Sequence, residues 1–409
     1  MRILFVCHRL PFPPNRGGKI RPFHMIQHLG RKHSVTVATL AHTEAERREG
    51  QPLADHCESV ICEVLPNHIR WLQACGALLS STPSSVAYFW SNRLFARIRE
   101  AWQARPFDII IVHCAFVAQY VRDLACSLRL LDYGDVDSGK WFDYARSRSF
   151  PLSIGYRIEA EKLIRYEKKL AAEFDICTAT TLGELEAVRK LNPAVKSAVI
   201  PNGVDLGYFH HRTSDPAGSS VLVFLGRMDY FPNIDGAMYF ARDVFPLIRE
   251  EIPQAQFLIV GSAPSRSIQN LSRLSGITVT GHVPDVRPYL ERAAVAVAPL
   301  RIARGTQNKI LQFLAMGVPV VTTPEAAKGV DAEVSKHFVV AEGSESFASR
   351  VINLLQDREL RTSLSLSGRQ SLATAHSWPA SMQILDNLLE QRTAGASHAA
   401  VPEFTERQI

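Results

Sequence analysis

Residues 221–227 read VLVFLGR, and residues 3–8 read ILFVCH. Each stretch is an uninterrupted apolar run, which is typical of a parallel strand buried on both faces. The later run ends at Gly226, and the earlier one leads through a proline-rich loop to Gly17 and Gly18. Each opens a half of the chain in which apolar strands alternate with helical patterns. We therefore predict an α/β fold of two Rossmann-like, doubly wound parallel-sheet domains.

The expected elements alternate along both halves. Strands are predicted at 2–8, 34–41, 59–65, 108–114, 128–134, 175–181, 220–226, 256–261, 277–281, 295–300, 318–323 and 337–341. Helices are predicted near 19–31, 43–56, 91–104, 116–126, 155–174, 182–191, 232–250, 285–293, 308–316, 344–356 and 358–373. These give an N-terminal domain at 1–198, a C-terminal domain at 199–375, a helix at 376–393 that packs back on the N-terminal domain, and a disordered tail at 394–409.

The charge of the chain is unevenly distributed. The 409 residues carry a net charge of +6, and residues 1–215 hold 28 Lys and Arg against 22 Asp and Glu. Residues 216–409 hold 18 of each kind. The excess fits an acidic acceptor, an anionic membrane face or simply a mildly basic domain, and the sequence leaves these three open. We expect no nucleic-acid partner.

The seven cysteines all lie in the first half, and no two have CxxC spacing. The sequence therefore indicates neither a zinc site nor a redox motif. Cys7, Cys114 and Cys177 fall in apolar runs and should be buried. The odd count, the short N-terminal apolar run and the lack of an 18-residue apolar stretch predict a cytoplasmic chain, with peripheral contact with the inner membrane left open.

Residues 67–90 break the alternating pattern. They contain several large apolar side chains but few charges. The stretch fits either a membrane- or acceptor-facing insertion or a helical hairpin covered by the core. We favour the covered hairpin because the apolar residues have no clean basic opposite face.

Two glycine-marked strand ends are suited to phosphate. Gly17 and Gly18 precede a helix, so the backbone there can approach a diphosphate that lies against helix N–H groups. Gly226 ends a strand and places Arg227 at the rim of the sheet, where a guanidinium can bind phosphate oxygens. The alternatives are an ordinary turn and a surface arginine paired with Asp229.

A third segment, residues 299–309 (PLRIARGTQNK), joins a strand end to a helix that begins near residue 308. Its helix start offers unsatisfied N–H groups to an anion. The cations of the segment raise the positive charge at that point. Arg301 adds to this charge, and the candidate donor-binding residues here are Arg304, Gly305, Thr306, Gln307 and Lys309.

Several motifs resemble one enzyme family. Residues 308–321 (NKILQFLAMGVPVV), 202–205 (NGVD) and 226–228 (GRM) are similar to the retaining glycosyltransferases of family 4, which have two facing Rossmann-like domains, the GT-B fold. Residues 135–141 (DVDSGKW) and 301–305 (RIARG) resemble a subgroup linked to bacterial exopolysaccharide and exosortase (PEP-CTERM) gene systems. The resemblance covers about residues 1–390.

The resemblance implies roles for five positions. Arg227 matches the donor-phosphate arginine, but Asn233 stands near the place of the lysine that usually follows it. The family's paired glutamates fall on Arg304 and Gln312, and Gln312 can still accept hydrogen bonds from the donor ribose. The resemblance implies that His113, at the end of the strand 108–112, is the first-domain histidine near the sugar.

Two further groups of residues bear on the donor. Backbone near 262–263 and near His282 and Val283 is expected to contact the base. Residues 135–137 (DVD) form a DxD motif of the kind that binds a metal in the other glycosyltransferase architecture. In a chain of this type we expect no metal, and Asp137 should instead cap a helix.

These observations predict a metal-independent glycosyltransferase that has no cofactor and uses a nucleoside diphosphate sugar as donor. Its catalytic residues would be Arg227, His113 and Arg304, and its acceptor a polysaccharide or lipid-linked saccharide. Charge developing on the leaving diphosphate would be stabilised by cations and a helix N-terminus. A nucleotide-sugar 2-epimerase and a non-catalytic nucleotide-sugar-binding partner remain as alternatives.

Overall fold

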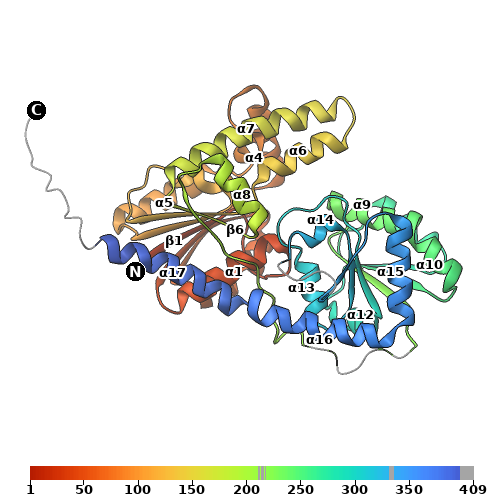
Figure 1. The fold of residues 1–409 in the computed structure, drawn as a ribbon. Helices are drawn as coiled ribbons and strands as arrows, with labels where there is room; N and C mark the ends of the chain where they lie inside the picture. Colours follow the sequence, from red (N-terminus) through yellow and green to blue (C-terminus); the bar gives the residue numbers. More distant parts are fainter. Residues whose placement is uncertain (211, 213–215, 217, 331–335, 397–409) are drawn as a thin grey trace, which may run out of the picture. The chain divides into compact units, whose positions relative to one another are not determined.

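In the computed structural model, the described residues are 1–409 except 211, 213–215, 217, 331–335 and 397–409 (Figure 1). The described chain divides into two compact units. The first comprises Met1–Ala179, Glu186–Ile200 and the C-terminal segment from Ser381. The second comprises Thr180–Leu185 and Pro201–Ala380. Most of the predicted tail, residues 397–409, lies outside the described residues.

In the described part of the first unit, seven strands form a parallel sheet in the order β3-β2-β1-β4-β5-β6-β7. The strands are β1 (Arg2–Cys7), β2 (Ser34–Ala41), β3 (Ser59–Val64), β4 (Ile109–His113), β5 (Leu128–Gly134), β6 (Ile176–Ala179) and β7 (Lys196–Val199). The order reverses at β1 and β4. In the register, Cys7 pairs with His113, and His113 pairs with Asp132.

Helices cover both faces of this sheet (Figure 1). They are α1 (Gly17–Gly30), α2 (Glu44–Glu49), α3 (Asn67–Gly76), α4 (Ser84–Ala87), α5 (Asn92–Ala104), α6 (Asp137–Ser147), α7 (Leu152–Glu173), α8 (Leu182–Leu191), α17 (Trp378–Ala396) and the 3₁₀ turns η1 (Gln51–His56), η2 (Ala77–Leu79) and η3 (Ala115–Tyr120). Asp386 of α17 accepts a hydrogen bond from His28 of α1 at 2.9 Å and another from Lys32, two residues after α1, at 2.6 Å.

In the described part of the second unit, six strands form a parallel sheet in the order β10-β9-β8-β11-β12-β13. They are β8 (Val221–Leu225), β9 (Gln256–Val260), β10 (Ile277–Gly281), β11 (Val295–Ala298), β12 (Val320–Thr322) and β13 (Val339–Val340). The helical segments are α9 (Phe231–Tyr239), the π-helical η4 (Phe240–Val244), α10 (Phe245–Glu251), α11 (Arg266–Gln269), η5 (Asn270–Arg273), α12 (Arg287–Arg292), α13 (Asn308–Ala315), α14 (Pro324–Ala327), α15 (Ser344–Gln356) and α16 (Arg358–Ala375).

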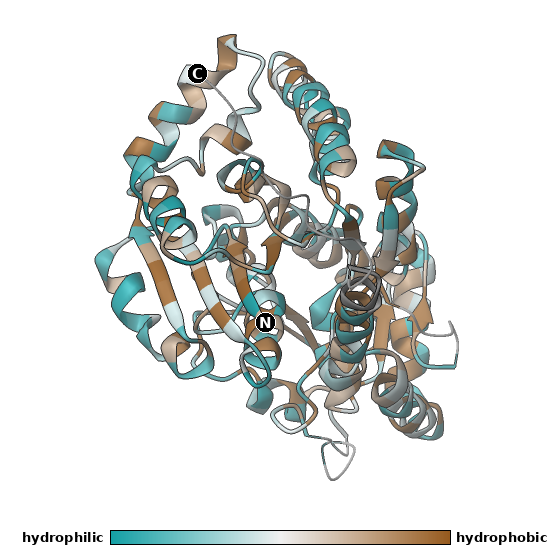
Figure 2. Ribbon diagram, turned by 90° about the vertical axis from the view of Figure 1, so that its left-hand side faces the viewer, coloured by the Kyte–Doolittle hydropathy of each residue, from teal (hydrophilic) through white to brown (hydrophobic). Residues whose placement is uncertain are grey.

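The cores follow from the sequence pattern. Figure 2 shows hydrophobic residues along the strands and an alternation of hydrophobic and hydrophilic residues around the helices. In the second unit the Phe240 and Phe257 rings pack with centroids 4.6 Å apart, and both side chains are fully buried. Cys7, Cys114 and Cys177 are buried, as the apolar runs predict. Burial of such runs is the main favourable term in folding.

Four sequence predictions differ from the structure. Strand β7, at the edge of the first sheet, was not predicted. The helix expected at 116–126 is only the 3₁₀ turn η3, and the helix expected at 43–56 divides into α2 and η1 at Gly50, where a Cβ would overlap the Leu10 side chain. Helix α6 is not among the predicted helix ranges, although Asp137 was expected to cap a helix there. It contains Gly and Ser, which disfavour helix, but its Trp141 ring packs 5.6 Å from the Tyr156 ring of α7.

The segment 67–90 is only partly covered. Its Ala74, Val86 and Phe89 are buried, but the Trp71 side chain is 62 % exposed and Leu79 is fully exposed. The expectation of a covered hairpin is therefore wrong for the residues of α3 and η2. Among the described residues, no helix is both long and apolar enough to cross a membrane.

Candidate active site

In the second unit, polar residues gather at the carboxyl ends of β8 and β11. These two strands are neighbours, and the strand order reverses between them, which is where doubly wound folds bind ligands. The loop after β8 begins with Gly226 and Arg227, and the loop after β11 runs to α13. The structure therefore brings the predicted segments 226–233 and 299–309 to one edge of one sheet.

Two glycines allow close packing of the loops after β8 and β9. A Cβ at Gly261 would overlap the carbonyl oxygen of Gly226, and the φ angle of Gly261 is +150°. A Cβ at Gly226 would lie 2.6 Å from the side-chain nitrogen of Asn233. The Met228 N–H donates to the Ser262 carbonyl at 2.9 Å. Because the glycines have no side chain, the backbones of the two loops pack directly on each other, and this fixes the backbone around Arg227.

Arg227 lies at this edge with its side chain 42 % exposed. Its Nε donates to Asp229 Oδ1 at 3.0 Å, and a second guanidinium nitrogen contacts the other carboxylate oxygen. This hydrogen bonding raises the pKa of Arg227 further above its ordinary value. The surface pair with Asp229, expected as the alternative reading, is thus present, and a phosphate bound here would share the guanidinium with Asp229.

Lys309, in the first turn of α13, is a partly buried cation of the site. Its Nζ donates to Asn233 Oδ1 at 2.6 Å and lies 4.5 Å from the centroid of the Phe224 ring. The Asn233 Nδ2 donates to the Arg227 carbonyl at 2.9 Å, which orients the amide. Burial lowers the pKa of Lys309 to about 7. The side chain of Lys309 is therefore present both as the ammonium and as the neutral amine near neutral pH.

The loop before α13 has a constrained backbone. Gly305 has φ +58°, and a Cβ at Gly329 would overlap its carbonyl oxygen. Gln307 donates from Nε2 to the Arg304 carbonyl at 3.0 Å. The Thr306 hydroxyl is buried and has no hydrogen-bond partner among the described residues. An unpaired buried hydroxyl beside a helix N-terminus is suited to an anionic ligand.

The arginines of this loop are held by carboxylates. Arg301 donates from Nε to Asp235 Oδ2 at 2.9 Å, and a guanidinium nitrogen of Arg304 lies 3.8 Å from Glu184 Oε1. Arg304 is about one-third exposed, so its ion pair is only partly shielded from solvent. The loop therefore combines several cations with fixed counter-ions, which limits the net positive charge offered to a ligand.

The remaining predicted donor residues lie at different distances from the reversal point of the sheet. Gln312 is half-buried in the second turn of α13. His282 is exposed and Val283 half-buried just after β10, two strands away from β8 at the edge of the sheet. All lie beyond the carboxyl ends of parallel strands, so they share the same edge as Arg227.

In the first unit, His113 ends β4 at the reversal point of its own sheet. Its Nδ1 lies 2.7 Å from Asp132 Oδ2, and the same carboxylate accepts from Arg21 Nε at 2.8 Å and from Thr178 Oγ1 at 2.7 Å. Burial opposes the charge on Asp132, but the Arg21 guanidinium and His113 hold the pKa of this carboxyl well below its usual range. Asp132 thereby fixes the imidazole by its Nδ1 and leaves Nε2 for other partners.

A second histidine, His8, follows β1 and was not predicted. Its ring stacks on the His113 ring with centroids 5.9 Å apart, and its Nδ1 is buried without a hydrogen-bond partner among the described residues. Burial, together with nearby Arg9, lowers the pKa of His8 well below its ordinary value. His8 is therefore neutral near pH 7. Gly18 lies against it, since a Cβ there would be 3.8 Å from His8 Nε2.

Two cations in the first turns of α1 are used inside the unit. The helix begins at Gly17, as the paired glycines indicate. Lys19, however, forms an ion pair with Glu46 at 3.0 Å, and Arg21 is buried against Asp132. The first turn of α1 thus offers backbone N–H groups, while these two side chains are occupied.

The DxD segment has no metal-binding neighbours. Within the described ranges, no three His, Cys, Asp or Glu side chains are grouped to hold a metal ion. Asp137 is not a cap, because α6 begins at Asp137 itself; the Ser138 N–H donates instead to Glu167 Oε1 of α7 at 3.2 Å. Burial raises the pKa of Asp137 to about 6 and that of Glu167 to about 8. The predicted cap by Asp137 is therefore wrong, although a helix does begin at that place.

Two doubly wound parallel sheets with polar groups at their reversal points define the class of protein as GT-B, and the predicted fold class is confirmed. Residues 219–357 match the family model described as Glycosyl transferases group 1. This part of the chain, from β8 to the end of α15, is therefore a glycosyltransferase domain. No curated protein matches the chain.

Solved structures match nearly the whole chain at low identity. Sucrose-phosphate synthase from Thermosynechococcus elongatus has a TM-score of 0.72 and 17 % identity, covering 97 % of this chain and 100 % of that one. Anabaena HepE in complex with UDP-glucose has a TM-score of 0.68 and 15 % identity, covering 96 % and 100 %. A variant of S. aureus TarM, in complex with Fondaparinux, alpha-GlcNAc-glycerol and UDP, has a TM-score of 0.66 and 10 % identity, covering 95 % and 99 %.

Proposed function

We propose that the protein is a retaining glycosyltransferase that transfers a sugar from a nucleoside diphosphate sugar to a polysaccharide or lipid-linked acceptor. The observation that carries the proposal is the group at the start of α13. There a partly buried lysine, Lys309, and an unpaired buried hydroxyl, on Thr306, lie beside a helix N-terminus at the reversal point of the sheet. Such a group is suited to a diphosphate. The UDP-glucose complex of HepE supports this donor class.

The reaction would depend on stabilising the leaving group. As the bond between the anomeric carbon and the diphosphate breaks, negative charge develops on the phosphate oxygens. Arg227, Lys309 and the first N–H groups of α13 would bind that charge more strongly in the transition state than in the ground state. The acceptor hydroxyl would attack from the same face and give its proton to the departing phosphate. This route needs no metal, no cofactor and no protein nucleophile.

The first unit would serve the acceptor and the donor sugar. His113, fixed through Asp132, would present its Nε2 toward the sugar, in the role that the sequence resemblance implies. The subgroup resemblance supports a place in exopolysaccharide biosynthesis on the cytoplasmic face of the inner membrane.

Two observations favour a non-catalytic alternative. Arg227 is engaged by Asp229, and the residue that would face the ribose is Gln312 and not a glutamate. A protein that binds a nucleotide sugar without turnover would tolerate both features. A nucleotide-sugar 2-epimerase fits less well, since it requires carboxylates where Arg304 and Gln312 stand.

Incubation of the protein with radiolabelled donor and no acceptor distinguishes these functions. Slow release of free sugar and nucleoside diphosphate supports the transferase. Inversion of the donor at C2 identifies an epimerase, and tight binding with no turnover identifies the non-catalytic partner. A panel of nucleoside diphosphates in thermal denaturation first selects the base, because ligand at 100 times Kd adds roughly 2.7 kcal/mol to the free energy of unfolding.

A further inference from the structure

An exposed apolar surface lies on the first unit, made of residues that have no part in the proposed reaction. Its first part is on α3 and η2, where four large side chains are more than half exposed: Trp71, Leu72, Leu78 and Leu79. Its second part is at the α6–α7 turn and the start of α7, where four more are about half exposed or more: Phe150, Leu152, Ile154 and Ile158. We call these eight residues the α3–α7 surface.

The two parts are neighbours. Lys162 of α7 donates from Nζ to the carbonyls of Ala77 and Leu78, at 3.0 and 2.9 Å. Ile158 lies one turn before Lys162 and therefore on the same side of α7, toward Leu78. Glu159 accepts from the Ser84 and Ser85 N–H groups at 2.9 and 2.8 Å. These buried polar contacts fasten α7 to the segment around η2 and leave the large apolar side chains outside.

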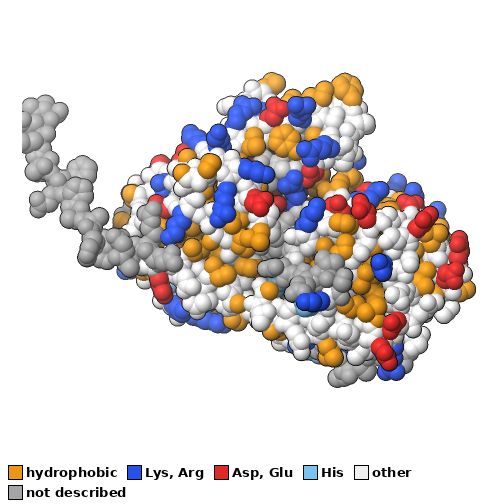
Figure 3. All heavy atoms as spheres, viewed as in Figure 1, with side chains coloured by type: hydrophobic (Ala, Val, Ile, Leu, Met, Phe, Trp, Pro, Cys, Tyr) orange, Lys and Arg blue, Asp and Glu red, His pale blue; other side chains and the backbone are white. Residues whose placement is uncertain are grey.

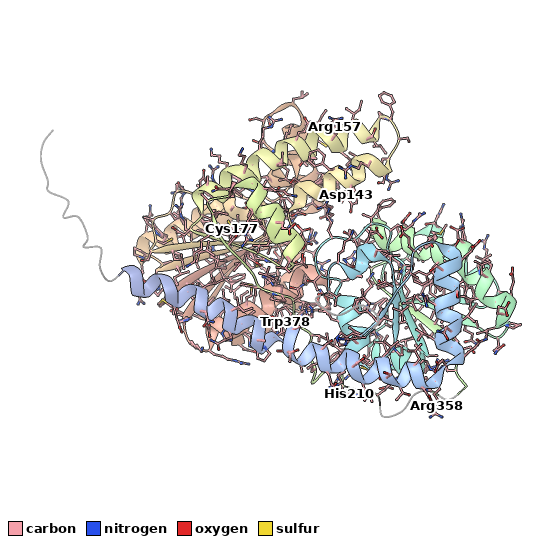
Figure 4. The ribbon with its side chains drawn as sticks, in the orientation of Figure 1. Asp143, Arg157, Cys177, His210, Arg358 and Trp378 are labelled. Atoms are coloured by element: carbon pink, nitrogen blue, oxygen red, sulfur yellow. The ribbon has the colours of Figure 1, made fainter. Side chains whose placement is uncertain are left out.

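The charge around this surface has one predominant sign. Residues 66–90 contain no Asp or Glu, and residues 138–169 contain eight Lys and Arg against four Asp and Glu. Lys162, Glu159 and Glu167 are buried, and Arg157 pairs with Glu161 at 3.2 Å, so the charges that face solvent are still mainly positive. Figure 3 shows Lys and Arg side chains among hydrophobic ones over α7 and beside it, at the top of the view, and Figure 4 labels Arg157 on this helix.

We propose that the α3–α7 surface docks on an anionic lipid bilayer. Large exposed apolar patches on a protein surface mark sites of protein–protein or membrane contact. Here Trp71 and the leucines would enter the boundary between head groups and acyl chains, and Arg148 and Arg157 would reach lipid phosphates. Anionic lipid attracts such arginines with about 1 kcal/mol each. The proposal rests on the proposed function only for its purpose, which is to bring the first unit to a lipid-linked acceptor.

The charge pattern favours a bilayer over a second copy of the chain. A two-fold dimer formed through this surface would place each basic rim against an identical rim. Like charges across an interface oppose association. An anionic bilayer has the complementary sign, and a tryptophan among leucines is typical of side chains that lie at the membrane interface.

Sedimentation of the full chain with vesicles tests the proposal, in the absence of donor and acceptor. We expect binding to vesicles of phosphatidylcholine mixed with phosphatidylglycerol, much less binding to phosphatidylcholine alone, and a decrease on addition of salt. The double variant Leu72→Ser/Leu79→Ser should bind about tenfold less or weaker still. Arg148→Gln/Arg157→Gln should lose about fivefold per arginine on the anionic vesicles only.

The matched control is Leu366→Ser, which changes an exposed leucine of α16 in the second unit. It should bind as the wild type does, and circular dichroism should show that all variants are folded. Equal binding of Leu72→Ser/Leu79→Ser and the wild type would overturn the proposal. The proposal would also be overturned if the wild type did not bind anionic vesicles but was a dimer in light scattering, while the double variant was a monomer. Because no turnover is measured, a failure of the proposed chemistry leaves this result unaffected.

Discussion

The Nζ of Lys309 lies 2.6 Å from the Oδ1 of Asn233, although the two residues are 76 positions apart in the sequence. The sequence resemblance puts the family's second donor-phosphate cation near residue 233, where this chain has an amide. The structure brings a lysine from α13 to that same amide. The positive charge is thus supplied by a different helix, and Asn233 positions it.

Lys309 should make nucleotide binding depend on pH. Its pKa is about 7 in the free protein, and a bound diphosphate should raise it, so binding above pH 7 takes up a proton. The affinity for a nucleoside diphosphate should therefore fall by up to about tenfold per pH unit above 7. Calorimetry at pH 8 in two buffers of different ionisation enthalpy measures the proton uptake. Uptake should disappear in Lys309→Met and persist in the control Lys328→Met, at an exposed lysine.

Arg227→Ala should lower kcat/KM by about two to three powers of ten, the scale of one lost charged contact to a transition state. The matched control is Arg301→Ala, whose guanidinium pairs with Asp235 at the same edge of the sheet and should matter by less than about tenfold. Steady-state kinetics with saturating acceptor measures both. Turnover of folded Arg227→Ala near that of the wild type would remove this arginine from the mechanism.

Asp132→Asn should destabilise the first unit by about 3–5 kcal/mol, because it leaves the Arg21 guanidinium buried without its counter-ion. The folded-state pKa of Asp132 lies well below the value near 3.9 of an unfolded chain, so the carboxylate stabilises the fold above that pH, and this contribution is lost as the pH falls below about 4. Urea denaturation at several pH values checks this. The loss below pH 4 should be smaller in Asp132→Asn than in the wild type or in the exposed control Asp55→Asn.

Activity should survive EDTA, since cations and a helix N-terminus are proposed to stabilise the diphosphate. Asp135→Asn combined with Asp137→Asn should then act mainly on stability, measured by thermal denaturation, and little on kcat. Restoration of a chelated enzyme by manganese would establish a metal at the DxD segment and contradict our account of the phosphates.

Gln312→Glu should tighten nucleoside diphosphate binding by up to about tenfold. A carboxylate accepts stronger hydrogen bonds from ribose hydroxyls than an amide does, a difference of about 1 kcal/mol. Repulsion between the new carboxylate and the diphosphate acts against this gain, and the nearby cations should largely screen it. Calorimetry gives the affinity. Clearly weaker binding would mean that the donor pocket is rebuilt in this chain, which favours the non-catalytic alternative.

Continuous apolar runs located twelve of the described strands, but not the short and largely uncovered edge strand β7, and they located the helices less well. The apolar run at 108–114 is β4, and its neighbours follow in the predicted order. The helix expected at 116–126 ends early as η3, after Cys114 adopts a φ of +79°, which local propensity does not indicate. Helix α6 packs against α7, and a carboxylate of α7, on Glu167, accepts a hydrogen bond from the first turn of α6. Contacts of this kind with another helix leave no pattern in the sequence of α6 itself.

The sequence predicted which loops form the candidate site, but it did not predict which side chains contact each other there. Glycines and cations after strands located the segments around Arg227 and Thr306. The contacts of Lys309 with Asn233 and of His113 with Asp132 join residues from different elements, and a single sequence does not show lateral neighbours. One signal was present for Asp132, because an isolated carboxylate within the apolar run 128–134 needs a buried partner.

The Asp132 carboxylate joins four elements, since its partners His113, Arg21 and Thr178 come from β4, α1 and β6 while it lies on β5 itself. The imidazole is therefore held by the frame of the sheet and not by the surrounding loops. Loops that take no part in holding a catalytic group can change in length and sequence without displacing it. Acceptor preference could thus be altered, by evolution or by grafting loops between relatives, while the reacting centre keeps its place.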